Sequence, residues 1–123
     1  MRRSMLFVPG NNPKMMTNCG FFGADAIIFD LEDAVSPDEK DAARLLVKYA
    51  VKNVERCRSE IIVRVNAADT PLFAQDLKTI VPQKPDYIML PKTASRQTVR
   101  DCDAAIGEIE RCCGMEPGTI SLI

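Results

Sequence analysis

Three acidic side chains follow an apolar segment early in the chain. The segment from Ala26 to Phe29 is apolar throughout, as a parallel strand covered on both faces requires, and Asp30, Glu32 and Asp33 follow it. Like charges this close repel one another unless a cation or a cationic substrate offsets them. Because α/β proteins place their sites where strands end and helices begin, these three acids are candidate catalytic residues. The structural alternative is a loop whose acids cap a helix or face solvent.

A helix start follows the acids. Ser36 and Glu39 have the spacing of a capping box, and Pro37 suits the first helical position. The pairs Asn12-Pro13 and Thr70-Pro71 repeat this arrangement of a capping side chain before proline. We therefore expect the acids to lie in a loop between a strand and a helix.

An arginine interrupts the third apolar segment. Alternation along this segment places Ile62, Arg64 and Asn66 on one face of the predicted strand. An arginine in so apolar a strand needs an anionic partner. That partner could be Asp30 or Glu32, in a structural ion pair, or the carboxylate of a substrate, bound by both arms of the guanidinium. The strand alone does not decide between them.

Two lysines lie at similar positions. Lys92 follows the fourth apolar segment, and Lys14 follows the turn that begins at Pro9. The N-terminus of the helix after that turn could bind an anion with help from Lys14, although a plain turn and cap explains the same residues. Four successive strands thus end in polar or charged groups, and this coincidence favours a site at that edge of the sheet.

Apolar runs alternate with amphipathic segments along the whole chain. The expected strands are Met5–Val8, Ala26–Leu31, Ile61–Val65, Tyr87–Leu90 and Thr119–Ile123. The expected helices are Pro13–Phe21, Pro37–Val54, Pro71–Val81 and Ser95–Cys113. In the second helix the expected buried stripe is Ala42, Leu45, Leu46, Tyr49 and Ala50, with Lys40, Asp41, Arg44 and Lys48 outside it. This order predicts an α/β fold with a parallel sheet and right-handed crossovers.

The last predicted strand, Thr119–Ile123, has no covering helix after it. We therefore expect a truncated chain: residues 1–123 would be the N-terminal portion, about four and a half βα units, of a single (βα)8 barrel domain, which takes about 250 residues. A non-enzymatic, five-stranded receiver-like domain is the alternative. That fold needs an acidic pair after the first strand and a phosphate-accepting aspartate after the third, where this chain has Pro9-Gly10 and Arg64-Val65-Asn66.

Composition narrows the function classes. The 123 residues carry a net charge of −1, which does not favour nucleic acid or an acidic membrane surface as a partner. No apolar stretch is long enough to span a bilayer, and no signal peptide is expected. With no histidine and no Cys-x-x-Cys pair, a zinc site is not expected. The five cysteines are expected to be free, as in a cytoplasmic protein.

Six blocks of sequence carry a resemblance to a known family. They are Arg3–Pro13, Gly23–Asp25, Phe29–Val35, Lys40–Arg44, Val63–Asn66 and Leu90–Thr93. In these blocks the chain resembles the citrate lyase beta subunits of the HpcH/HpaI aldolase superfamily, in register from end to end. The resemblance implies a (βα)8 barrel, assembled as trimers or larger homo-oligomers, that cleaves a carbon–carbon bond in an acyl thioester with Mg²⁺ (or Mn²⁺).

The resemblance also implies substrates and partners. A citryl thioester on an acyl carrier protein would give oxaloacetate and an acetyl thioester, in a complex with the alpha subunit and the acyl-carrier gamma subunit of citrate lyase. Malyl-CoA or citramalyl-CoA lyase activity of the same superfamily is the alternative.

Roles for individual residues follow from the same resemblance. Arg64 matches the arginine that binds a substrate carboxylate, and Phe7 and Lys14 match substrate contacts of the first βα loop, although some relatives have tyrosine in place of Phe7. The acids Glu32 and Asp33, with Asp30, match a block near the metal that does not ligate it directly. In the family, the metal-ligating Glu and Asp follow the fifth and sixth strands, so no metal ligand is expected within these residues and activity of the chain alone is in question.

Overall fold

A computed structural model describes all 123 residues as a parallel sheet flanked by helices. The strands are β1 (Met5–Pro9), β2 (Ala26–Asp30), β3 (Glu60–Arg64), β4 (Tyr87–Met89) and β5 (Ser121–Leu122). The α-helices are α1 (Pro13–Asn18), α2 (Lys40–Asn53), α3 (Leu72–Ile80) and α4 (Arg96–Cys112). Short 3-10 helices are η1 (Cys19–Phe22), η2 (Pro37–Glu39) and η3 (Val81–Gln83). The five strands and four helices expected from the sequence are confirmed, with ends shifted by a few residues.

The strands follow one another across the sheet in the order β1-β2-β3-β4-β5. A receiver-like domain has the order 2-1-3-4-5, so the receiver-like alternative is wrong. Consecutive neighbours joined by helices are the arrangement of a (βα)8 barrel, and the α/β prediction is confirmed. One row of paired positions crosses the carboxyl end of the sheet: Pro9 opposite Asp30, Asp30 opposite Arg64, and Arg64 opposite Met89. The polar residues that follow these strands therefore share one edge, which we call the rim.

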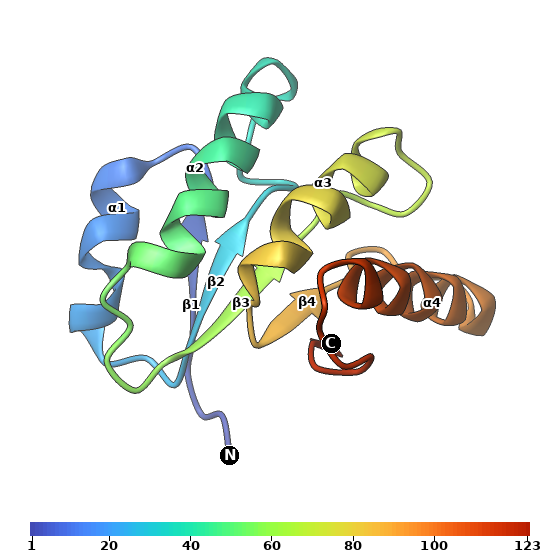
Figure 1. The fold of residues 1–123 in the computed structure, drawn as a ribbon. Helices are drawn as coiled ribbons and strands as arrows, with labels where there is room; N and C mark the ends of the chain where they lie inside the picture. The colour runs from blue at the N-terminus through green and yellow to red at the C-terminus, as the bar shows by residue number, and fades with distance from the viewer.

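The two faces of the sheet differ in what covers them. Figure 1 shows the four α-helices ranged along one face, where a cluster of 20 buried apolar residues forms the main core. On the other face the buried apolar cluster is only Ala26, Ile28 and Ile62, with Tyr87 and Met89 packed against it. Strands β1 and β5 each pair with a single neighbour. Arg64 belongs to the face without helices, as alternation predicted for it and Ile62.

The buried stripe of α2 is not the one that its larger side chains suggest. Ala43, Val47 and Ala50 face the core, whereas Leu45 and Tyr49 are 55% and 59% exposed. Arg44, expected on the outer side, is buried. The predicted stripe is confirmed at Leu46 and Ala50 and is wrong at Ala42, Leu45 and Tyr49, where the neighbouring Ala43 and Val47 face the core instead. Small side chains let a helix approach a sheet closely, so the face rich in alanine packs inward even though its neighbours are larger.

One of the three predicted proline-associated caps forms as expected. The Asn12 side chain accepts a hydrogen bond from the Met15 backbone N–H at 3.1 Å, with Pro13 first in α1. The capping box at Ser36 is wrong: its hydroxyl donates to the Glu39 carboxylate at 2.8 Å, and η2 precedes α2. The Thr70 hydroxyl likewise donates to the Ala67 carbonyl at 2.7 Å and caps no helix. Hydroxyls that bond within their own turns are not available to cap helices.

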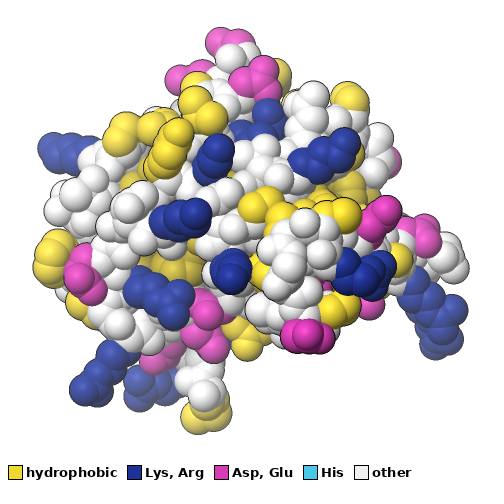
Figure 2. All heavy atoms as spheres, viewed as in Figure 1, with side chains coloured by type: hydrophobic (Ala, Val, Ile, Leu, Met, Phe, Trp, Pro, Cys, Tyr) yellow, Lys and Arg dark blue, Asp and Glu magenta, His cyan; other side chains and the backbone are white.

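The surface over the helices carries both signs of charge. Figure 2 shows lysine and arginine side chains interspersed with acids on this face, with apolar side chains reaching the surface between them. None of the helices is both long and apolar enough to cross a membrane.

Candidate active site

Arg64, at the end of β3, and Asp30, at the end of β2, form a two-point ion pair. The guanidinium donates from Nε to Oδ1 of Asp30 at 2.8 Å and from Nη2 to Oδ2 at 2.6 Å. The two residues are partners across the strands, so the register itself brings them together. Of the two partners that the sequence left open for Arg64, the structure thus provides the protein carboxylate. The Nη1 group takes no part in this pair and lies 3.6 Å from Oε2 of Glu32.

Asp30 is fully occupied by these contacts. Its Oδ1 also accepts the backbone N–H of Glu32 at 2.8 Å, and its Oδ2 accepts that of Ala34 at 2.9 Å. Burial alone would raise the pKa of Asp30, but the Arg64 guanidinium and the two backbone N–H groups outweigh it, so the pKa lies below its usual value. A carboxylate with four donors and a low pKa is a poor proton acceptor. Asp30 therefore holds the loop and orients Arg64.

Glu32 is buried between two cations. Its side chain is 7% exposed, and both carboxylate oxygens are enclosed. Nζ of Lys92 is 2.7 Å from Oε1, and Nη1 of Arg64 is 3.6 Å from Oε2. Among the three candidate acids, Glu32 alone is both buried and paired with two different cations.

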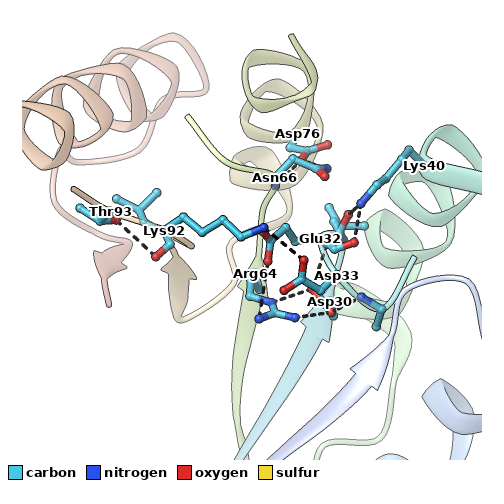
Figure 3. A network of polar contacts seen from close by, with 12 residues as sticks. Asp30, Glu32, Asp33, Lys40, Arg64, Asn66, Asp76, Lys92 and Thr93 are labelled. Carbon is cyan, nitrogen blue, oxygen red and sulfur yellow. Dashed lines mark hydrogen bonds and ion pairs between the residues drawn. The ribbon is translucent and has the colours of Figure 1, made fainter. Parts of the chain in front are cut away.

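Lys92 reaches this cluster from the loop after β4, on the other side of β3 from the acids. It lies beyond β4 and extends to Glu32 and to Asp33, whose Oδ1 is 3.3 Å from Nζ (Figure 3). The Glu32 carboxylate beside it raises the pKa of Lys92, with a further contribution from Asp33. Asp33 itself is 63% exposed. The acids of one loop and the cation of another are therefore joined over the end of β3.

The other predicted residues divide into those near Arg64 and those away from it. The Phe7 ring, on β1, lies 5.0 Å from the guanidinium carbon of Arg64, a cation–π contact that shields one side of the cation. Lys14 is exposed in α1 and lines a groove with Leu6, Met15 and others, outside the Arg64 cluster. The alternation of β3 ends with the strand, because the Asn66 side chain donates to Asp76 of α3 at 2.7 Å.

Sequence reasoning missed a second polar network beside the site. Arg44 of α2 donates from Nε to Asp76 at 2.6 Å, and Asp76 accepts both the backbone and side-chain N–H of Asn66. Lys40, expected to face solvent, donates to the Leu31 carbonyl at 2.7 Å and to the Glu32 carbonyl, and burial lowers its pKa. A cation in the first turn of a helix is unfavourable for the helix dipole, and this was the one available signal that Lys40 has another partner.

The rim offers a ligand space but no metal site of its own. A pocket of about 270 Å³ lies beside the cluster, lined by Glu32, Asp33, Lys40, Asn66, Lys92 and others. No group of three or more His, Cys, Asp or Glu side chains is placed to hold a metal ion. Asp30 is committed to Arg64, and Glu32 and Asp33 face Lys92. The residues present therefore do not form a metal centre, whereas the exposed ammonium of Lys92 and the partly exposed guanidinium of Arg64 can attract an anionic ligand.

Comparison with known proteins gives consistent relatives. The citrate lyase subunit beta of Leuconostoc mesenteroides subsp. cremoris is 45% identical over 123 residues, which is all of this chain and 41% of the relative. The L-malyl-CoA/beta-methylmalyl-CoA lyase of Cereibacter sphaeroides is 35% identical over 115 residues, 91% of this chain and 36% of the relative. The chain thus spans about two fifths of the length of the curated relatives it matches.

A solved structure has the same fold. A citrate lyase beta subunit from M. tuberculosis, complexed with oxaloacetate and magnesium, superposes with a TM-score of 0.67 at 26% identity, covering 96% of this chain and 55% of that one. The family model for HpcH/HpaI aldolase/citrate lyase matches residues 3–123. With this match running through every strand and through the rim, the chain belongs to the HpcH/HpaI aldolase/citrate lyase family.

Proposed function

We propose that this chain forms the carboxylate-binding side of a carbon–carbon lyase active site that acts on acyl thioesters. The substrate is a citryl thioester on an acyl carrier protein, and the products are oxaloacetate and an acetyl thioester. The observation that carries the proposal is Arg64, whose guanidinium is held at the strand ends by Asp30 and is still 20% exposed. The relatives named citrate lyase subunit beta, at 45% identity over the whole chain, support the substrate.

Each side chain of the cluster has one task in this proposal. Arg64 binds a substrate carboxylate with the exposed part of its guanidinium, and Asp30 orients it. Phe7 covers the guanidinium and keeps water from one side of it. Glu32, held between Lys92 and Arg64, accepts the proton of the substrate hydroxyl as the carbon–carbon bond breaks. Outside the cluster, Lys14 of α1 is the proposed substrate contact of the first βα unit.

A divalent cation is the proposed cofactor of the complete site. We propose Mg²⁺ or Mn²⁺ because a solved relative is complexed with magnesium. When bound, such an ion polarises the oxygens of a keto acid. Its ligands are not among the residues described above, since no suitable group of acids exists in this chain. Glu32 and Asp33 would then lie near the ion without ligating it.

The assembly and the alternative substrates complete the proposal. We propose a cytoplasmic homo-oligomer that works with alpha and acyl-carrier gamma subunits, as the free cysteines and the citrate lyase relatives suggest. Malyl-CoA or citramalyl-CoA cleavage is the second candidate, because a malyl-CoA lyase shares 35% identity with 91% of the chain. The higher identity to citrate lyase subunits favours the citryl thioester.

An assay on the protein isolated from its source, with the subunits that copurify, tests the proposed function. Citryl, malyl and citramalyl thioesters are supplied in turn, with Mg²⁺ and then with a chelator. We expect metal-dependent release of a keto acid, largest for the citryl thioester. Cleavage that the chelator leaves unchanged, or no cleavage across the panel, contradicts the proposal. The mass of the isolated polypeptide is measured in the same experiment.

The 123-residue chain by itself should behave as an open structure. Strands β1 and β5 each have an unpaired edge, and the face of the sheet without helices is covered only in part. Barrels remove such edges by closing, so we expect the isolated chain to oligomerise or aggregate and to bind Mg²⁺ only weakly. Sedimentation velocity and calorimetric titration measure both properties. A stable monomer that binds Mg²⁺ in the micromolar range contradicts both expectations.

A further inference from the structure

Lys40, the first residue of α2, donates to backbone carbonyls and pairs with no acid. Its half-buried ammonium donates to the Leu31 carbonyl at 2.7 Å and to the Glu32 carbonyl (Figure 3). It takes part in none of the ion pairs of the rim. A positive charge in the first turn opposes the helix dipole, and a partly desolvated ammonium needs acceptors. Both of its acceptors lie in the loop after β2, so Lys40 ties that loop to α2.

The two carbonyls belong to the peptide groups on either side of Glu32. The first of these groups is held at both ends, because its carbonyl accepts from Lys40 and its N–H donates to Asp30 at 2.8 Å. The carbonyl of the second group accepts the N–H of Val35 at 3.2 Å as well as Lys40. A peptide group is planar, so holding the planes on both sides of a residue fixes its φ and ψ and the direction of its Cβ. Lys40 and Asp30 therefore set the direction in which the Glu32 side chain leaves the loop.

This direction decides whether the Glu32 carboxylate lies within the site. The carboxylate stands between Nζ of Lys92, 2.7 Å from Oε1, and Nη1 of Arg64, 3.6 Å from Oε2. A proton acceptor works only within hydrogen-bond reach of the proton that it takes. A shift of about 1 Å in a catalytic group is enough to slow a reaction severely. The peptide groups that Lys40 holds are therefore a condition for the proposed role of Glu32.

Helix α2 holds a second loop of the rim in a similar way. One turn after Lys40, Arg44 donates to Asp76, and Asp76 accepts the backbone N–H of Asn66 in the loop after β3. Residues four apart lie on one side of a helix, so α2 directs two cations toward two consecutive loops. Lys40 and Asn66 also line the same rim pocket of about 270 Å³. The helix is thus a common base for both loops.

We propose that Lys40 is a positioning residue that acts through Glu32: it holds the peptide groups on both sides of Glu32 and so keeps that carboxylate where it accepts the substrate proton. Substrate affinity depends on Arg64, which Asp30 holds without a contact from Lys40. Loss of Lys40 should therefore lower kcat and leave KM nearly unchanged. This inference rests on the proposed function, because it takes Glu32 as the proton acceptor.

The test is made on the protein as its source produces it, with the subunits that copurify, and on the thioester that it cleaves best. Lys40→Met keeps an unbranched apolar side chain but donates no hydrogen bond. We expect kcat to fall by about tenfold to a hundredfold, as for a misplaced catalytic group, and KM to change by less than about twofold. Lys40→Arg still offers donors for both carbonyls and should retain most of the turnover. If Lys40→Met does not fold, Lys40→Gln takes its place, with the same expected result.

Hydrogen–deuterium exchange, measured by mass spectrometry, follows the loop independently of activity. Lys40→Met should speed exchange about tenfold in the segment from Leu31 to Val35, as the loss of about one hydrogen bond predicts. Strands β2 and β3 should keep their protection. Lys52, an exposed lysine near the other end of α2, is the matched control. Lys52→Met should change neither the exchange nor kcat.

A double variant separates positioning of Glu32 from a general structural role. Glu32→Gln should lower kcat strongly, and adding Lys40→Met should lower it little further, because no proton acceptor is left to position. An equal loss of kcat in both backgrounds would show that Lys40 acts independently of Glu32, and would overturn the inference.

The remaining outcomes separate this inference from the proposed function. If Lys40→Met turns over normally while Glu32→Gln does not, only the role of Lys40 is wrong. If Glu32→Gln turns over normally, the role of Glu32 as proton acceptor is wrong, and the positioning role of Lys40 is wrong with it. If the unchanged protein cleaves none of the thioesters, the proposed function and the role of Lys40 are both contradicted.

Discussion

Arg64 and Arg44 each pair with a buried aspartate, one at the rim and one between helices α2 and α3. Arg64 contacts Asp30 at 2.8 and 2.6 Å, and Arg44 contacts Asp76 at 2.6 Å. Asp30 also accepts two backbone N–H groups from the loop after β2, and Asp76 accepts one from the loop after β3. In both pairs the aspartate connects a cation to a βα loop, so the chemistry of the pairs is the same.

The two arginines differ in what remains of the guanidinium. In Arg44 the Nη1 group is also tied, to Asp41 at 2.6 Å, and Nη2 is enclosed without a partner. In Arg64 the Nη1 group faces the Glu32 carboxylate at 3.6 Å, and 20% of the side chain is exposed. An enclosed donor without a partner costs stability, whereas a partly exposed donor can meet a ligand. The surroundings of each arginine, rather than its ion pair, distinguish a structural residue from a binding residue. We call the buried structural pair of Arg44 and Asp76 the brace.

Removing the acid of the brace should have the largest effect. Asp76→Asn leaves Arg44 buried without its main countercharge, and we expect a loss of about 3 kcal/mol in the free energy of unfolding. Asp41 is 86% exposed, so Asp41→Asn should cost less than about 1 kcal/mol. Urea unfolding of the two variants measures the difference. Equal losses for both would mean that Arg44 is not the enclosed brace described here.

Conservative replacement of the rim arginine should affect binding more than stability. Arg64→Lys keeps the charge but loses the planar guanidinium and its two-point geometry. We expect substrate binding to weaken by about 1.5–3 kcal/mol, the range for hydrogen bonds to charged groups, with a small change in the thermal midpoint. Isothermal titration and thermal melting are run on the same samples. A large drop in midpoint with normal binding would make Arg64 a second structural brace.

The sequence predicted the rim well because its residues follow directly from strand order. Once five parallel strands are recognised, Asp30, Arg64 and Lys92 must lie at one edge, and the register makes Asp30 and Arg64 neighbours. What the sequence could not decide was the partner of Arg64. That depends on side-chain geometry over 34 residues of separation, which no local pattern encodes.

The brace escaped prediction for a related reason. Helical periodicity assigns the most apolar face to the core. That face was built on Leu45 and Tyr49, and Arg44 lies outside it, so Arg44 was expected on the outer side. In the structure the small Ala43 and Val47 pack inward, and Arg44 turns in with them because Asp76 is there to receive it. A buried charge is permitted only by a partner on another element, and in this case the partner follows 32 residues later.

The pH dependence of stability should distinguish the role of Asp30. Because its folded pKa is lowered, the stability that Asp30 supplies is complete above its ordinary pKa and is lost as the pH falls through the lower folded value. We expect Asp30→Asn to be less stable than the unchanged chain by about 1.5 kcal/mol at neutral pH. This difference in stability should narrow as the pH falls below the ordinary pKa of aspartate and disappear below the lowered pKa of folded Asp30. Urea midpoints at several pH values measure it. A gap that stays constant into strong acid would show that Asp30 acts through shape rather than charge. Asp25, whose pKa is lowered chiefly by Arg3, is present in both proteins and cancels in the comparison.

The smallest effect concerns Lys84 and Lys92. Like the two arginines, these lysines share one feature, here the backbone conformation, and differ in their surroundings. Lys84 and Lys92 have φ values of 60° and 51°, and only Lys92 pairs with acids. Glycine relieves left-handed strain, so Lys84→Gly should raise the free energy of unfolding by about 0.5–1 kcal/mol. Lys92→Gly gains the same relief but loses exposed ion pairs of similar value, so we expect almost no net change.

Thermal melting in low and high salt measures the effect of both substitutions. High salt should weaken the pairs of Lys92 in the unchanged chain and make Lys92→Gly comparatively stabilising, while the effect at Lys84 stays constant. Equal stabilisation by the two glycines in low salt would mean that the acids do not hold Lys92 at the rim.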